Sequence, residues 1–243
     1  MSYVLILGAK SDIARAIAKE YAKNGYNLYL SARKIHELEE FARDIIIKTQ
    51  KDVKLLELDI IDYEMHQEFY NQLLEKPLGV ITVVGYLGDQ DRAQSDFSEA
   101  KRIIDTNYSG VVSLLNIIAN DFEKRGFGFI VGISSVAGDR GKKSNYLYGS
   151  AKAALTTYLS GLRNRLHKVN VQVLTVKPGF VNTKMTANMV LSSKLMAQPK
   201  EVAKEIYDAQ NRKKEILYTK WFWRWIMLII KMIPENIFKK MNL

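Results

Sequence analysis

The chain alternates short apolar runs with longer segments in which apolar residues recur every three or four positions. The short runs are residues 3–7, 27–30, 53–58, 80–84, 127–133, 171–176 and 216–218. Most are aliphatic or β-branched on both faces, which is typical of parallel strands that are covered by helices on both sides. The segments with helical spacing are residues 12–24, 35–49, 63–74, 97–125, 146–168 and 200–212.

This alternation predicts an α/β fold. We expect a doubly wound parallel sheet of the Rossmann type, with about seven strands and helices on both faces. Residues 1–219 should form this single domain, and residues 220–243 a C-terminal apolar and basic helix. Ligands of such sheets bind at the carboxyl ends of the strands, so the chemistry should follow the strands directly.

The composition narrows that chemistry. The 243 residues contain no cysteine, which excludes a disulfide framework, a thiolate zinc site and thiol catalysis. His36, His66 and His167 lie far apart and outside any metal-ligand spacing, so we expect no metal site. The net charge is +10, and residues 212–243, with eight basic and two acidic side chains, contribute six of these charges. Because the basic charge gathers in this tail, we expect no nucleic-acid partner.

The first predicted strand runs through a glycine turn into a helix, with the sequence Gly8-Ala9-Lys10-Ser11-Asp12-Ile13. Free backbone N–H groups at a helix N-terminus can bind a pyrophosphate, so these residues are candidate cofactor contacts. The alternative is an ordinary turn in which Ser11 or Asp12 caps the helix.

The ends of the next strands indicate which dinucleotide binds. Where an NAD site usually has an acidic residue, this chain has Arg33, whose guanidinium can bind a ribose 2′-phosphate, and Lys10 adds positive charge. Asp59 and Ile60 follow the third strand, where a carboxylate can accept from the adenine amino group or, alternatively, cap the next helix. Gly85 follows the fourth strand and permits a close approach to the cofactor. We therefore expect NADPH, with NADH as the alternative cofactor; without a cofactor, Arg33 would simply begin a loop.

The most specific signal is Tyr148-Gly149-Ser150-Ala151-Lys152. Tyrosine and lysine four residues apart share one helix face, and a nearby ammonium group favours the phenolate and lowers the pKa of the tyrosine. Tyr148 is therefore a candidate acid/base near neutral pH. This spacing alone is common, but here Ser135 follows the fifth strand and Asn107 lies in the long helical segment upstream.

Taken in order over nearly all of the first 190 residues, these segments resemble the short-chain dehydrogenase/reductase family. The resemblance implies a catalytic tetrad of Asn107, Ser135, Tyr148 and Lys152. Ser135 is preferred to Ser134 because the family places its serine 13 residues before its tyrosine. In the implied reaction Tyr148 protonates a carbonyl oxygen held by Ser135. Lys152 tunes Tyr148 and binds the nicotinamide ribose, and Asn107 holds a water of the proton relay.

The same resemblance assigns the nicotinamide contacts to the segment after the sixth strand. These contacts are Pro178, Gly179, Val181 and Thr183. Two segments depart from the family pattern. Asp12 and Ala14 replace the second and third glycines of the first turn, and Thr82-Val83-Val84-Gly85 replaces Asn-Asn-Ala-Gly. Neither departure removes a residue of the tetrad.

A narrower resemblance concerns Gly85-Tyr86-Leu87-Gly88-Asp89, residues 135–152 and the tail from Trp225 to Lys240. These segments resemble the decaprenylphosphoryl-2-keto-erythro-pentose reductases. That resemblance implies NAD(P)H-dependent reduction of a keto-sugar on a polyprenyl phosphate in cell-envelope glycan synthesis, with a flavin oxidase as partner. One alternative is a reductase of another apolar ketone, such as a 3-oxoacyl or steroid-like substrate. The other is a non-catalytic nucleotide-binding scaffold or sensor, which would have no need of a full tetrad.

Two helical segments also suggest self-association. Residues 97–125 and 146–168 carry more apolar residues than one helix face needs, and the family builds its subunit contacts from these helices. Examples are Ile103, Ile104, Val111, Val112, Leu115 and Ile118. We therefore expect a homodimer or a homotetramer.

The tail suggests contact with a membrane surface. Residues 221–233 are rich in Trp, Phe, Ile, Leu and Met but too short to span a bilayer, which needs about 20 apolar residues. A helix here, ended by Pro234, would have a wide apolar face edged by Lys220, Arg224 and Lys231. We expect a cytoplasmic protein whose residues 220–240 bind the inner face of the cytoplasmic membrane peripherally. The alternative is that the helix covers the substrate cleft or packs on a partner subunit.

Overall fold

Seven parallel strands form a single sheet in the computed structural model, which describes residues 2–187 and 195–241. The strands are β1 (Tyr3–Leu7), β2 (Asn27–Ala32), β3 (Val53–Glu57), β4 (Gly79–Thr82), β5 (Gly128–Ile133), β6 (Val171–Pro178) and β7 (Ile216–Thr219). Their order is β3-β2-β1-β4-β5-β6-β7, so the direction of winding switches between β1 and β4. The predicted doubly wound α/β fold and all seven predicted strands are confirmed.

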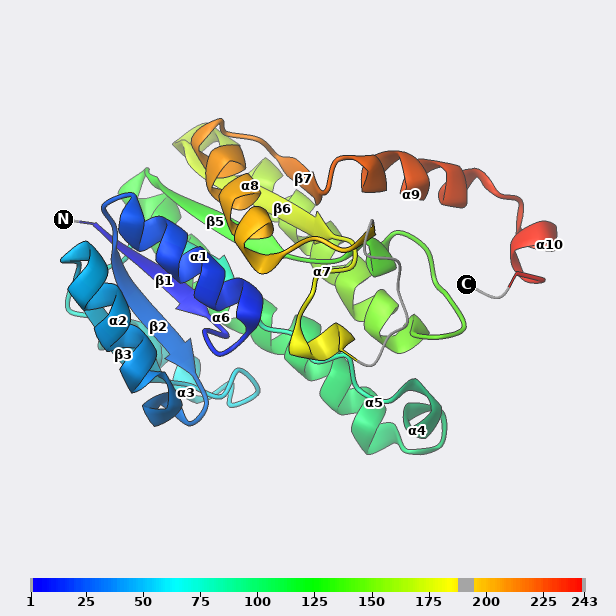
Figure 1. Cartoon of the computed structure of the whole chain (residues 1–243), viewed down its shortest axis with the longest axis horizontal. Helices are drawn as coiled ribbons and strands as arrows, with labels where there is room; N and C mark the ends of the chain where they lie inside the picture. The colour runs from blue at the N-terminus through cyan, green and yellow to red at the C-terminus, as the bar shows by residue number, and fades with distance from the viewer. Residues whose placement is uncertain (1, 188–194, 242–243) are drawn as a thin grey trace.

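Helices cover both faces of the sheet (Figure 1). On one face lie α1 (Asp12–Lys23), α2 (Glu39–Thr49) and α8 (Pro199–Asn211). On the other face lie α3 (Met65–Asn71), α6 (Gly110–Arg125) and α7 (Tyr146–Leu166). A separate apolar core fills each interface, which explains why the strands are apolar on both sides.

Several helical features differ from the prediction. The expected helix over residues 97–125 consists of α5 (Phe97–Ile104), a π-helical turn (Asp105–Ser109) and α6. The short helix α4 (Gln90–Ser95) was not predicted, because one or two polar turns carry no apolar period. The C-terminal helix expected over residues 220–243 is divided at Pro234 into α9 (Phe222–Met232) and α10 (Glu235–Phe238). Short 3-10 turns occupy Ile35–Leu38, Val136–Gly138, His167–Val169 and Lys184–Thr186.

The apolar residues that suggested self-association lie mostly inside the monomer. Ile103, Val111, Leu115 and Ile118 are at most 1% exposed, and they pack within the protein's own cores. Only Ile104 and Val112 of this set are partly exposed. The excess of apolar residues therefore serves the fold, and it does not by itself indicate a subunit contact.

The C-terminal helix α9 (Phe222–Met232) extends beyond the end of β7, and only one of its faces is buried (Figure 1). Trp223 and Met227 are buried, and the Trp223 ring contacts Phe180 at a centroid distance of 5.4 Å. A Cβ added to Gly179 would lie 2.0 Å from the Trp223 Nε1 atom, so the indole rests directly on that glycine. The helix ends at Met232, two residues before Pro234, as predicted. None of the described helices is long and apolar enough to cross a membrane.

Arg140 fastens the end of α9 to the loop that follows β5. Its Nη1 atom donates to the carbonyl oxygens of Ile230 and Ile233, each at 2.6 Å, and Nη2 donates to the Glu235 carboxylate at 2.8 Å. These bonds satisfy carbonyl groups that a helix leaves unpaired at its C-terminus. The tail and the loop between β5 and α7 are therefore held together.

We predict that Gly110→Ala lowers the free energy of unfolding by about 1–3 kcal/mol, the usual cost of overpacking. A Cβ at Gly110 would lie 2.1 Å from the backbone oxygen of Ile60, so α6 could not keep its distance from the segment after β3. Gly161 on α7 is the matched control, because a Cβ added there would have no neighbour within 4 Å. Gly161→Ala should be neutral or stabilise by about 0.5–1 kcal/mol. Urea denaturation measures both, and equal stability of the two variants would contradict this packing.

Candidate active site

Two adjoining cavities open at the carboxyl ends of the strands. The β2-side cavity, about 230 Å³, is lined by Leu7, Gly8, Lys10, Ser11, Ser31, Ala32, Arg33, Leu58, Asp59, Ile60, Val83, Val84, Gly85, Tyr86, Arg102 and Thr106. The β5-side cavity, about 270 Å³, is lined by Lys10, Ser11, Asp12, Ile13, Val83, Val84, Gly85, Ile133, Ser134, Ser135, Tyr148, Lys152, Pro178, Gly179, Val181, Thr183, Lys184, Met185 and Thr186. Five residues from the ends of β1 and β4 line both cavities. All the predicted site residues except Asn107 line one cavity or the other.

The turn before α1 both caps the helix and leaves its N-terminus open to a ligand, the two alternatives that the sequence offered. Gly8 has a φ of +80°, and a Cβ there would lie 2.9 Å from the backbone nitrogen of Val84, so only glycine fits. The Ser11 hydroxyl accepts from the Ala14 N–H at 3.2 Å and caps the helix. Asp12 accepts from the Lys184 N–H at 3.0 Å, which joins this turn to the loop after β6. The helix is thus capped, and its N-terminus still faces the cavities.

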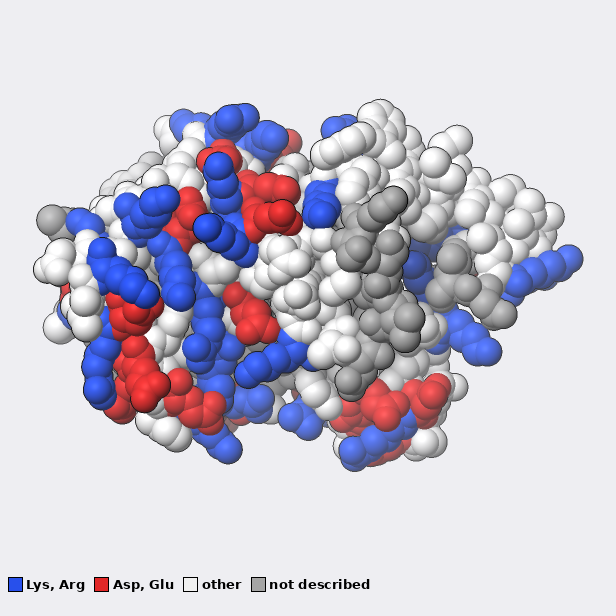
Figure 2. Space-filling view, viewed as in Figure 1, with Lys and Arg blue, Asp and Glu red and all other residues white. Residues whose placement is uncertain are grey.

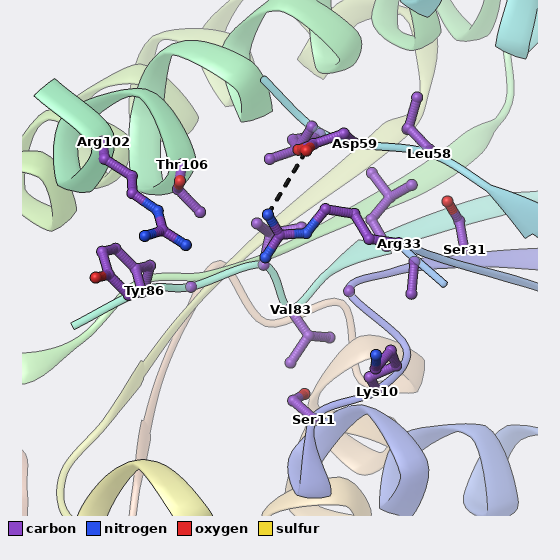
Figure 3. Close-up of a pocket in the computed structure, with 16 residues that line it drawn as sticks. Lys10, Ser11, Ser31, Arg33, Leu58, Asp59, Val83, Tyr86, Arg102 and Thr106 are labelled. Carbon is purple, nitrogen blue, oxygen red and sulfur yellow. Dashed lines mark ion pairs between the residues drawn. The ribbon is translucent and has the colours of Figure 1, made fainter. Parts of the chain in front are cut away.

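Positive charge gathers in the β2-side cavity (Figure 3). Arg33 lies 3.6 Å from the carboxylate of Asp59, and the two side chains are 60% and 37% exposed. Lys10 pairs with Glu37 at the surface. Exposed ion pairs of this kind contribute little free energy, so both cations can exchange partners for a bound anion at low cost.

Tyr86, Arg102 and Thr106 line the β2-side cavity, but the sequence interpretation missed them. Arg102 and Thr106 are four residues apart on the helical segment that carries Asn107, so they share one face. Arg102 and Thr106 lie five residues and one residue before Asn107, which is not the spacing of a shared helix face, so the position of Asn107 gave no signal for either.

Tyr148 and Lys152 lie on one face of α7, as predicted, with the Lys152 Nζ atom 5.7 Å from the Tyr148 ring centroid. Lys152 is 2% exposed, and Nζ donates to the carbonyl oxygens of Ile133 at 3.1 Å and Val84 at 3.3 Å. Burial lowers the pKa of Lys152 to about 7. Backbone carbonyl groups therefore hold the lysine in place, and its side chain is shielded from solvent.

The predicted lowering of the Tyr148 pKa is wrong for this structure. Burial raises the pKa of Tyr148 to about 12, and a hydrogen bond with Ser135 opposes the rise. The ammonium group does not compensate, because Lys152 is desolvated and directs its protons at two carbonyl oxygens. Tyr148 is thus held as a protonated phenol, the form that donates a proton.

The two consecutive serines after β5 have different roles. Ser134 is buried, donates to the Lys152 carbonyl oxygen at 2.8 Å and contacts the Thr156 hydroxyl at 2.7 Å, so it ties β5 to α7. Ser135 accepts from the Ala137 N–H at 3.1 Å and forms the hydrogen bond with Tyr148. The geometry therefore places Ser135 beside the phenol, at the predicted spacing.

Asn107 lies in the π-helical turn, fully buried behind Gly85. Its Nδ2 atom donates to the carbonyl oxygens of Tyr86 at 2.6 Å and Ile103 at 2.8 Å, and Oδ1 accepts from the Tyr86 N–H at 3.2 Å. With these three bonds made, the side chain holds the backbone after β4 in place. Asn107 does not itself line either of the two cavities.

The wall beyond β6 closes the β5-side cavity. Val181 pairs with Ala197 in a parallel bridge, and the Thr186 hydroxyl donates to the Val181 carbonyl oxygen at 2.6 Å. Thr183 begins the next 3-10 turn, where Thr186 completes the cap. In residues 2–187 and 195–241, no three His, Asp or Glu side chains gather into a metal site.

Comparisons with known proteins agree on one family. The model of the short chain dehydrogenase family matches residues 2–193. An uncharacterised oxidoreductase of Mycobacterium tuberculosis is 33% identical over 241 residues, which cover 98% of this chain and 96% of that protein. Sulfoacetaldehyde reductase 2 of Chromohalobacter salexigens is 31% identical over 188 residues, covering 75% of this chain and 74% of that protein.

A similar solved structure is that of a short-chain dehydrogenase from Sphingobium yanoikuyae in complex with NADPH. It has a TM-score of 0.84 and 22% identity, and the match covers 97% of each chain. The fold, the two cavities and the family match lead to the same conclusion: the chain belongs to the short-chain dehydrogenase family of oxidoreductases.

Proposed function

We propose that the protein is an NADPH-dependent carbonyl reductase with Tyr148 as its general acid. The observation that carries this proposal is the grouping of Ser135, Tyr148 and Lys152 in one cavity, which adjoins a second cavity that contains Arg33 and Lys10. NADPH fits this pair of cavities, because Gly8 leaves room at the turn and the N-terminus of α1 offers N–H groups to a pyrophosphate. The bound NADPH of the Sphingobium relative supports the same choice of cofactor.

The residues of the β5-side cavity divide the chemistry between them. Bound NADPH would supply a hydride to the carbonyl carbon of the substrate. Ser135 donates a hydrogen bond to the carbonyl oxygen, and Tyr148 gives that oxygen its proton, since burial keeps the phenol protonated. Lys152 binds the nicotinamide ribose, with Pro178, Gly179, Val181 and Thr183 along the nicotinamide side.

The lipid-linked keto-sugar remains our preferred substrate, and a different apolar ketone is the second candidate. The support is the surface of α9 and of Trp221, the residue directly before it: Trp221 is 74%, Ile229 64% and Met232 73% exposed. Figure 2 shows this uncharged surface over α9. An enzyme of a polyprenyl-linked sugar must meet its substrate at a membrane, where such a surface is useful. A flavin oxidase as partner, and a homodimer or homotetramer as the assembly, belong to the same proposal.

A groove between β7 and α9 adds positive charge to this surface. It measures about 510 Å³ and is lined by Lys214, Ile216, Leu217, Tyr218, Trp221, Arg224, Trp225, Leu228 and Lys231. Three of these residues are cations, three are aromatic and none is acidic. Aromatic rings and cations together suit the headgroup layer of an anionic membrane. We therefore propose that a cytoplasmic protein binds this layer peripherally through residues 220–240.

Tyr148→Phe should lower kcat by about 10²–10⁴-fold while NADPH still binds, because the proton donor is lost and the ring shape is kept. The measurement is the rate of NADPH oxidation with a panel of carbonyl compounds, beside an NADPH titration of each variant. Near-normal turnover by the variant on the best substrate would exclude Tyr148 as the general acid.

Arg33→Ala should weaken NADPH binding by roughly 1.5–3 kcal/mol and leave NADH binding nearly unchanged, because only NADPH carries the 2′-phosphate. Titrations of both cofactors, followed by protein fluorescence, measure this difference. Arg43→Ala is a matched control, since Arg43 is an exposed cation on α2 that pairs with Glu39 and lies outside both cavities. If the wild-type protein binds NADPH and NADH equally, the assignment of Arg33 is wrong.

The intact protein should float with anionic vesicles at low salt and dissociate at high salt. The double variant Trp221→Ala/Ile229→Ala should lose most of this binding, because it removes exposed apolar area from α9. Leu74→Ala is the control, since Leu74 is 90% exposed but lies elsewhere on the surface. Absence of the intact protein from floated anionic vesicles would disprove the membrane contact.

A further inference from the structure

The β2-side cavity contains a second arginine, which the glycine turn and Arg33 do not account for. Arg102 on α5 is exposed and lines the cavity together with Arg33. In Figure 3, the two arginines project into the cavity from opposite sides, one from the end of β2 and the other from α5. Among the described residues, Arg102 has no carboxylate within ion-pair distance, whereas Arg33 pairs with Asp59. Arg102 is therefore a cation whose position in the cavity needs another explanation.

The ring of Tyr86, which lies against Arg102, is held rigidly by hydrogen bonds. The Arg102 guanidinium carbon lies 4.4 Å from the centroid of the Tyr86 ring. The Tyr86 hydroxyl donates to the Glu99 carboxylate at 2.7 Å, and that carboxylate, only 4% exposed as a residue, also accepts from the Asp89 N–H at 3.1 Å. Asn107 binds both the N–H and the carbonyl group of Tyr86. The ring is thus fixed at its hydroxyl and at its backbone, and it holds one face of the guanidinium.

We propose that Arg102 forms the outer wall of the adenine site, with its guanidinium group stacked between the Tyr86 ring and the adenine ring of the cofactor. A guanidinium group is planar, so it can stack on an aromatic ring with each of its two faces. Figure 3 shows Thr106 beside Arg102, whereas Lys10 and Arg33 come from the ends of β1 and β2. Arg102 therefore faces the base, and Arg33 and Lys10 face the 2′-phosphate.

This role holds only if the proposed function is right that a dinucleotide occupies the cavity, and it makes a prediction that differs from that for Arg33. Adenine is common to NADPH and NADH. Arg102→Ala should therefore raise the Kd of both cofactors by the same factor, about 3- to 30-fold for a cation–aromatic contact. Arg33→Ala, by contrast, should affect NADPH alone.

The test is calorimetric or fluorescence titration of NADPH and of NADH into the full chain, with no substrate present. The variant Arg102→Lys keeps the positive charge but lacks the planar guanidinium group, so it should bind both cofactors about as weakly as Arg102→Ala. Arg92→Ala is the matched control, because Arg92 is a nearby exposed cation that pairs with Asp96 and does not line the cavity. Thermal unfolding of each variant checks that the fold is kept.

Equal weakening of both cofactors, without recovery in Arg102→Lys and without an effect of Arg92→Ala, supports stacking on adenine. Weakening of NADPH alone, or recovery of affinity in Arg102→Lys, would overturn it in favour of a charge contact with phosphate. Unchanged affinity of Arg102→Ala for both cofactors would also overturn it. Failure of the wild-type protein to bind either cofactor would instead reject the proposed function itself.

Discussion

A buried ammonium group determines the geometry of the site. Lys152 lies between the ends of β4 and β5 and donates to one carbonyl oxygen from the end of each strand, those of Val84 and Ile133. A cation out of water is costly unless it is hydrogen-bonded, so α7 cannot move away from these strands without a large penalty. Tyr148 lies one turn earlier on α7, and the same bonds therefore fix the phenol beside Ser135. The hydrogen bond from the Ser134 hydroxyl to the Lys152 carbonyl oxygen adds a second link between β5 and α7.

The fold and most site residues could be predicted because their signals are local. Strands apolar on both faces indicate a sheet covered on both sides, and the topology of such a sheet brings the residues after Leu7, Ala32 and Ile133 to one edge. What the sequence could not reveal depends on surroundings. The spacing of Tyr148 and Lys152 says nothing of desolvation, so the direction of the Tyr148 pKa shift was wrong. The π-helical turn at Asn107 has the same residue pattern as an α-helix, and Arg102 approaches the cavity from a helix rather than a strand end.

The two faces of the C-terminal helix have different surroundings. Its inner face, with Trp223 on Gly179, forms the back of the wall that closes the β5-side cavity. Its outer face stays exposed, and Arg140 links its end to the loop after β5. A buried ion pair between Lys177 and Asp139, with the Tyr218 hydroxyl on the same carboxylate, fixes that loop to β6 and β7. The surface that we assign to the membrane and the wall of the proposed catalytic cavity thus lie on opposite faces of α9.

The central claim is that the two cavities form one dinucleotide site that ends at Tyr148. An experimental structure of the protein with NADP⁺ tests this claim most directly. We predict the 2′-phosphate beside Arg33, the pyrophosphate at the N-terminus of α1 and the nicotinamide ring next to Tyr148 and Ser135. A nucleotide bound elsewhere, or bound with its nicotinamide ring in the β2-side cavity, would contradict the account.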